Sequence, residues 1–195
     1  MRRFSFLLGA LALTLILSPA VAKAAGFEPG VGGWTGWYVG FHIGTNRNAY
    51  NGFGSADTLT QELTGGYNFQ LNPKLVLGAD LYSDWNTDTN HSVNALPGVS
   101  ANYGSRGLGM EFMAGFPAGN FLPYVKAGYG QLSISGNLSG TANGARYGAG
   151  LMWRINTYSG LMLQYTYQKV NISNSLGNGD YRNSNITVGY NWFFD

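Results

Sequence analysis

Cysteine is absent from this chain of 195 residues, and charged residues make up only 10% of it. Without cysteine, the fold has no disulfide and no thiolate metal ligand. Beyond residue 24 there is no apolar run of about 18 residues, the length that predicts a transmembrane helix. Apolar residues at helical spacing are equally scarce. Strands and turns are therefore the expected elements.

The first 24 residues have the pattern of a secretory signal peptide. Arg2 and Arg3 precede an apolar run over 4–17, and Ala22-Lys23-Ala24 supplies the small residues of a cleavage site, with cleavage after Ala22 or Ala25 as alternatives. Removing this segment takes three of the 11 basic residues and leaves eight against nine acidic ones, a formal charge of −1. Such a chain lacks the basic footprint of a nucleic-acid-binding protein.

Glycine and aromatic residues are abundant, with 30 Gly, 13 Tyr and 11 Phe. Large apolar side chains alternate with small or polar ones, which is the period of a strand with two different faces. The alternation recurs in eight stretches, at 37–44, 63–71, 75–82, 109–116, 125–130, 147–155, 161–168 and 186–194.

The spacing of these eight stretches favours a membrane barrel over a soluble sandwich. The connections alternate between short ones at 72–74, 117–120 and 156–160 and long polar ones at 46–57, 86–102, 135–143 and 171–183. Outer-membrane barrels combine an even number of strands with short periplasmic turns and long outer loops. We therefore predict an all-β, eight-stranded antiparallel transmembrane β-barrel with up-and-down meander topology. Its domains are the signal peptide (1–24), a Gly-rich segment (25–35) and the barrel (36–195).

The polar face of the strands predicts a charged lumen. If Phe116 pairs with Phe121 across the turn at 117–120, then Glu111 pairs with Lys126, and opposite charges suit a buried polar interior. The predicted lumen network consists of His42, Glu62, Asp80, Glu111, Lys126, Arg146, Arg154 and Gln164.

Aromatic residues near the strand ends predict the two belts that mark membrane interfaces. The predicted interface residues are Trp37, Tyr67, Phe69, Trp85, Phe116, Tyr147, Trp153, Trp192 and Phe194, with Tyr82, Tyr103 and Tyr181 near the long loops.

Several segments resemble the small eight-stranded outer-membrane barrels, the OmpA-like, opacity-type or "porin family" proteins. They are "GGWTGWYVGFHIG" (32–44), "GGYNFQLNPKLVLGADL" (65–81), "FLPYVKAGYG" (121–130), "YGAGLMWRI" (147–155) and "LMLQYTYQ" (161–168). The resemblance implies the outer membrane of a Gram-negative cell, with lipids and lipopolysaccharide as neighbours. It also implies that Val188, Tyr190, Trp192 and Phe194 form the C-terminal signal for the barrel-assembly machinery. Family chains usually end on Phe, whereas Asp195 follows here.

Two polar motifs are weak matches to known sites. Asp84, Asn86, Asp88 and Asn90 begin like a calcium loop, but Thr89 and Ala95 stand where that loop needs Gly and Glu. The adjacent His91 and Ser92 resemble the Ser-His pair of outer-membrane lipid A deacylases, but those residues stand two apart in that family. We predict no catalytic residue, no metal site and no cofactor.

An eight-stranded barrel has an interior just wide enough for side chains. The expected function is therefore non-enzymatic: envelope integrity, and display of four surface loops for adhesion or for a host or matrix ligand. The alternatives are a narrow channel for ions or small solutes and, third, a barrel enzyme acting on lipid A.

Overall fold

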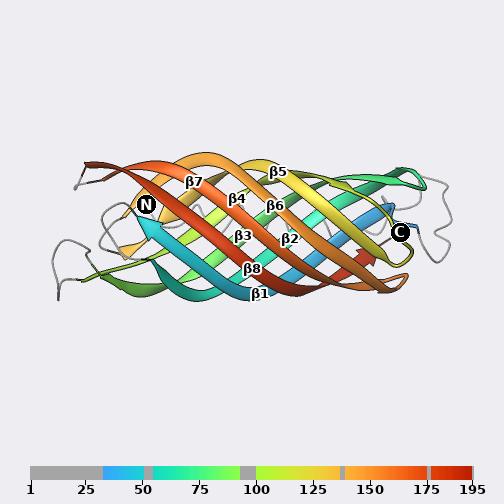
Figure 1. The fold of residues 1–195 in the computed structure, drawn as a ribbon, viewed down its shortest axis with the longest axis horizontal. Helices are drawn as coiled ribbons and strands as arrows, with labels where there is room; N and C mark the ends of the chain where they lie inside the picture. The colour runs from blue at the N-terminus through green and yellow to red at the C-terminus, as the bar shows by residue number, and fades with distance from the viewer. Residues whose placement is uncertain (1–32, 51–54, 93–99, 137–138, 175–176, 195) are drawn as a thin grey trace, which may run out of the picture.

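The computed structural model describes residues 33–50, 55–92, 100–136, 139–174 and 177–194. The predicted signal peptide and most of the Gly-rich segment lie outside these ranges. Eight strands make up nearly all of the described chain (Figure 1). They are β1 (Gly36–Tyr50), β2 (Ala56–Asn72), β3 (Leu75–Ser92), β4 (Ser100–Gly115), β5 (Phe121–Ile134), β6 (Gly140–Asn156), β7 (Ser159–Asn174) and β8 (Gly177–Phe194).

The strands close into one antiparallel barrel in sequence order. Closure is made by β1 and β8, where Val39 faces Trp192 and Ile43 faces Val188. A closed ladder pairs the backbone groups of every strand on both sides, as a hydrocarbon environment requires. The predicted fold class and topology are confirmed. Among the described residues, none belongs to a helix with the length and hydropathy needed to cross a membrane.

Three two-residue turns define one end of the barrel, which we call the turn end. Pro73-Lys74 joins β2 to β3, Gly119-Asn120 joins β4 to β5, and Thr157-Tyr158 joins β6 to β7. Gly119 has a φ of 62°, a value that a residue without a Cβ adopts at little cost. The three short connections are confirmed.

The opposite end, which we call the loop end, differs from the prediction. The expected long loops at 46–57, 86–102, 135–143 and 171–183 are largely strand, because β1 continues to Tyr50, β3 to Ser92 and β7 to Asn174. The prediction failed because the outward face loses its large apolar residues there. Backbone pairing continues all the same.

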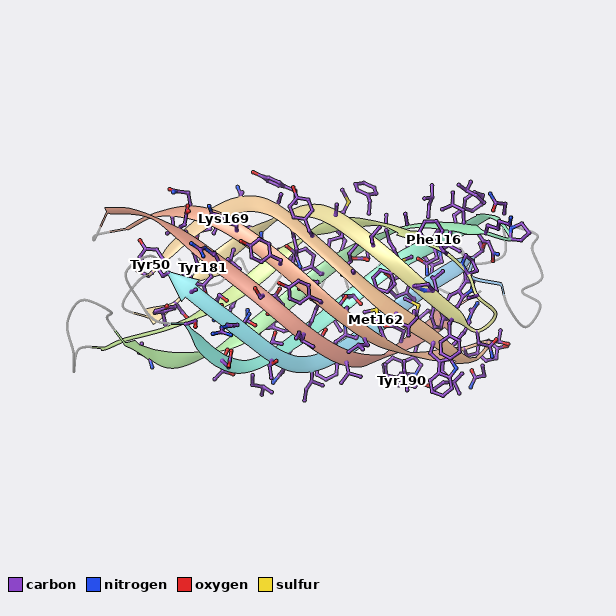
Figure 2. The ribbon with its side chains drawn as sticks, in the orientation of Figure 1. Tyr50, Phe116, Met162, Lys169, Tyr181 and Tyr190 are labelled. Atoms are coloured by element: carbon purple, nitrogen blue, oxygen red, sulfur yellow. The ribbon has the colours of Figure 1, made fainter. Side chains whose placement is uncertain are left out.

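The alternation changes phase along the strands. On β7, Leu161, Leu163 and Tyr165 point outward and are exposed. Nearer the loop end, Val170 and Ile172 point inward and are buried. The outer wall is thus apolar in the turn-end part and polar in the loop-end part. Inside the loop-end part, apolar side chains lie together with buried asparagines such as Asn46 and Asn183. Figure 2 shows side chains on both faces of the wall, with Tyr50 and Tyr181 near the loop end and Phe116 and Tyr190 near the turn end.

Candidate functional site: the barrel lumen

Arg146 is the centre of the charged lumen. Its guanidinium carries ion pairs to three carboxylates: Nη1 lies 2.9 Å from Oδ2 of Asp84, Nε lies 3.3 Å from Oε1 of Glu111, and Nη2 pairs with Glu62. The guanidinium also lies over the ring of Tyr82, with Cζ 3.7 Å from the ring centroid. This arrangement uses the planar fork of donors that distinguishes arginine from lysine.

Lys126 and Glu111 form a second ion pair, with Nζ 2.5 Å from Oε2. The predicted contact between these side chains is present, but the predicted register is wrong. Glu111 is paired with Gly128, and Lys126 with Met113. The turn is two residues long instead of four, which shifts the partner strand by two positions. A shift of two preserves the face on which each side chain lies, so the two charges still meet diagonally.

Glu62 also contacts an imidazole and a side-chain amide. Nδ1 of His42 lies 3.2 Å from its Oε1, and the Nε2 amide of Gln164 donates to the same oxygen. On the other side of the imidazole, Nε2 lies 3.0 Å from Oδ1 of Asn191. Each of these side chains is buried. The carboxylate therefore has charged and polar partners together, which offsets the cost of removing it from water.

Asp80 and Arg154 have partners other than Arg146. Asp80 accepts a hydrogen bond from the hydroxyl of Tyr38 at 2.9 Å. Arg154 lies at the turn end, where Cζ is 4.4 Å from the ring centroid of Phe193 and Nη2 donates to the carbonyl of Thr157 at 2.9 Å. Eight residues of strand separate Arg154 from Arg146, about 26 Å along the chain. Asp80 is the strand partner of Glu111 and lines the lumen beside Lys126. The structure thus gathers seven of the eight predicted lumen residues, namely His42, Glu62, Asp80, Glu111, Lys126, Arg146 and Gln164.

Sequence reasoning missed Asp84 as a member of the lumen group. Its carboxylate pairs with Arg146 and accepts the backbone N–H of Gly107 at 2.9 Å. The signal was available, because Asp80, Tyr82 and Asp84 alternate along one face of β3. Among the described residues, no group of three or more His, Asp or Glu side chains is placed to hold a metal ion.

Two apolar clusters lie on either side of the charges. On β5, Leu122 and Tyr124 precede Lys126, and Leu132 and Ile134 follow it. The turn-end cluster contains Trp34, Tyr38, Val76, Met113, Leu122, Tyr124, Met152, Met162 and Phe193. The loop-end cluster contains Tyr50, Tyr103, Leu132, Ile134, Val170, Ile172 and Tyr181. The lumen is therefore layered: apolar, charged, apolar.

Glycine residues give the large lumen side chains their room. A Cβ at Gly128 would lie 2.1 Å from the carbonyl oxygen of Met110 and 2.7 Å from Cγ of Glu111. At Gly150 it would lie 2.4 Å from the hydroxyl of Tyr124. These glycines are needed for close packing inside a narrow barrel.

The nine aromatic residues assigned to the membrane interfaces lie on the outer wall. Trp37 contacts Tyr67 edge-on, with ring centroids 5.1 Å apart, and Phe121 stacks on Trp153 at 5.9 Å. Three further aromatic residues expected near the long loops lie inside the barrel instead: Tyr82, Tyr103 and Tyr181 are at most 1% exposed. Tyr103 and Tyr181 were placed on the wrong face because large side chains point inward, not outward, in the loop-end part of the strands.

The remaining predicted residues are only partly described. Val188, Trp192 and Phe194 of the proposed assembly signal are exposed on β8, and Tyr190 is half-buried against Trp192, with ring centroids 4.6 Å apart. Asp195 lies outside the described residues. His91 and Ser92 belong to β3, but their side chains lie outside the described part of the chain.

Known proteins resemble this chain in sequence profile and in fold. The profile of the family described as "Outer membrane protein beta-barrel domain" matches residues 8–194. Neisserial surface protein A superposes with a TM-score of 0.64 at 18% identity, covering 82% of this chain and 98% of its own. OprG from Pseudomonas aeruginosa gives 0.57 at 14% identity, covering 85% and 99%. A search of curated sequences finds no match. Likeness at these identities supports the fold alone. Because the profile spans nearly the whole sequence, the chain belongs to the outer membrane protein β-barrel domain family.

Proposed function

We propose that this protein is a non-enzymatic outer-membrane barrel that maintains envelope integrity and presents its loop end to a host or matrix ligand. Family membership supports the outer membrane as its location. The observation that carries the non-conducting part of this proposal is the layered lumen, in which a charged layer lies between two apolar clusters. Apolar constrictions oppose the passage of hydrated ions.

The proposed partners follow from the two surfaces of the barrel. The exposed apolar wall of the turn-end part suits lipid chains, including those of lipopolysaccharide. The aromatic end of β8 suits the barrel-assembly machinery during insertion. The loop end suits a ligand outside the cell, since connections on a rigid scaffold commonly carry recognition.

Conductance in planar bilayers tests this proposal against the channel alternative. We expect the refolded protein to give no discrete current steps. The double variant Trp34→Ala, Phe193→Ala removes two large side chains from the turn-end cluster and leaves the loop-end cluster unchanged. We expect this variant to give no current steps either, because the loop-end cluster still blocks the lumen. Regular single-channel steps from the unsubstituted protein would overturn the non-conducting part of the proposal.

Complementation in cells tests it against the enzyme alternative. A strain lacking the protein should become more sensitive to detergent, and Ser92→Ala should restore resistance as well as the unsubstituted protein does. Release of fatty acid from lipopolysaccharide by the purified protein, lost in Ser92→Ala, would replace the proposal with the enzyme.

A further inference from the structure

Charged residues on the outer wall are distributed unequally between the two ends. Within the part of the chain that the structure describes, the apolar band on the outside of the barrel carries no charge. Beyond this band toward the loop end, the first outward charge is basic on four strands, namely Arg47 on β1, Arg106 on β4, Lys169 on β7 and Arg182 on β8. Toward the turn end, the described outer surface has only Lys74, in a turn.

Three of these cations are neighbours on adjacent strands. Arg182 lies directly opposite Lys169 in the pairing of β7 with β8. It lies opposite Ala49 in the pairing of β8 with β1, two positions from Arg47 on the same face. Directly opposed side chains in a sheet have Cβ atoms about 5 Å apart, and diagonal ones are about 7–8 Å apart. Like charges at such spacing repel each other in the absence of an anion.

Two acidic residues only partly neutralise this group. Nζ of Lys169 lies 2.7 Å from Oδ2 of Asp180, and this bond, with one from Asn171, holds the pKa of Asp180 below its usual range. Asp57 lies 4.0 Å from Nε of Arg47, with both side chains exposed. Arg182 lies close enough to Asp180 to act on it electrostatically, but it forms no ion pair with any described residue, so its guanidinium is available to a ligand.

We propose that Arg47, Lys169 and Arg182 form a binding site for a phosphate group of an anionic glycolipid such as lipid A in the outer leaflet. The position of the three residues fits this ligand, because each is the first charged outward residue above the lipid-facing band on its strand, at the depth of headgroups. Lys169 projects from the outer wall near the loop end in Figure 2. A guanidinium binds phosphate through two parallel hydrogen bonds, which gives Arg182 the leading role.

Phosphate outside the membrane and lipid phosphate share the same chemistry, and the apolar band decides between them. In an anionic glycolipid the phosphate and the acyl chains are attached to the same sugar headgroup. Chains that pack on Tyr165, Tyr167 and Ile186, on the turn-end side of the cations, therefore hold the phosphate beside the wall, whereas free phosphate gains nothing from these side chains. The inference rests on the proposed location of the barrel in the outer membrane.

Binding of fluorescent lipid A to the refolded protein in neutral phosphatidylcholine vesicles tests the site. Each cation near a charged membrane surface contributes about a fivefold effect on affinity. We expect Arg182→Gln to weaken binding about fivefold or more, and the triple variant Arg47→Gln, Lys169→Gln, Arg182→Gln to weaken it at least tenfold. Lipid A with its phosphates removed should bind the unsubstituted protein as weakly as the triple variant binds lipid A.

Arg106→Gln is the matched control, because Arg106 is also an outward guanidinium at the band edge but faces Trp85 and Ser133 instead of another cation. It should change binding less than twofold. Equal losses for Arg106→Gln and Arg182→Gln, or equal binding of dephosphorylated lipid A, would overturn the site. Excess inorganic phosphate, compared with chloride at equal ionic strength, should not displace the lipid; displacement would mean that the site takes phosphate without its acyl chains.

Gel migration that changes on heating confirms that each variant is folded in neutral vesicles before binding is measured. The vesicle measurement is independent of where the protein resides in the cell. If the folded protein does not bind lipid A, the site is rejected and the proposed function is unaffected. If lipid A binds normally but deletion of the protein causes no envelope defect, the proposed function is rejected and the site is retained.

Discussion

Arg146 is the residue on which the internal charge balance depends most. It is buried and pairs with Glu62, Asp84 and Glu111, so its removal leaves three carboxylates with less compensation in a low-dielectric interior. Breaking a buried ion pair by removing one partner costs far more than the pair contributes when intact, because an unpaired buried charge remains.

Arg146→Gln should therefore lower the free energy of unfolding by about 3–5 kcal/mol. Urea unfolding in lipid vesicles, followed by tryptophan fluorescence, measures the loss. Arg106→Gln removes an exposed guanidinium that forms no ion pair with a described residue, and it should change stability by only about 0.5 kcal/mol. Equal small changes for the two variants would contradict the central role of Arg146.

At the scale of elements, each strand crosses two different environments. On β7 the large side chains lie outside at Leu163 and Tyr165 and inside at Val170 and Ile172. The outward apolar stretch corresponds to lipid contact, and the inward stretch corresponds to a core of the kind found in water-soluble barrels. The same strand is thus stabilised by lipid over one part and by the hydrophobic effect over the other.

A pair of arginine substitutions on the outer face of β7 tests where lipid contact ends. Leu163→Arg places a charge within the apolar band and should cost about 2–4 kcal/mol of stability. Asn171→Arg has the same outward orientation beyond the band and should cost almost nothing. Unfolding in vesicles measures both free energies. Similar costs for the two would mean that the band extends to Asn171.

Sequence predicted the membrane-facing parts of the strands because lipid imposes a strict alternation on them. The prediction of long loops failed because the large residues move from the outer to the inner face between Tyr167 and Val170. Beyond this point the outer face is polar, which is the pattern expected of a loop. Sequence reasoning placed Glu111 and Lys126 on the correct face, because parity survives a shift of two. It missed the register itself, which the turn at Gly119-Asn120 determines.

At the scale of the whole molecule, assembly depends on closing β8 against β1. Trp37 faces Phe194 and Val39 faces Trp192, so the end of the chain completes the barrel. Until this pairing forms, both edges present unpaired backbone groups. The aromatic end of β8 is therefore needed for closure in addition to any role as an assembly signal.

Deletion of Phe194 and Asp195 together should impair assembly, whereas deletion of Asp195 alone should not. The amount of heat-modifiable protein in outer-membrane fractions measures assembly. The physical reason is that Phe194 is the last residue paired with β1. Equal yields from the two truncations would refute the importance of this pair.

The change of face of the large side chains also determines how far the strands extend beyond the lipid-facing band. From Lys169 to the end of β7 at Asn174 the strand continues for about 17 Å. With the tilt usual for such barrels, this raises the end of β7 about 13 Å above Lys169. The connections are thus carried on a rigid pedestal with a water-compatible exterior. The ligand proposed for the loop end would therefore be bound beyond the headgroups of the surrounding lipid.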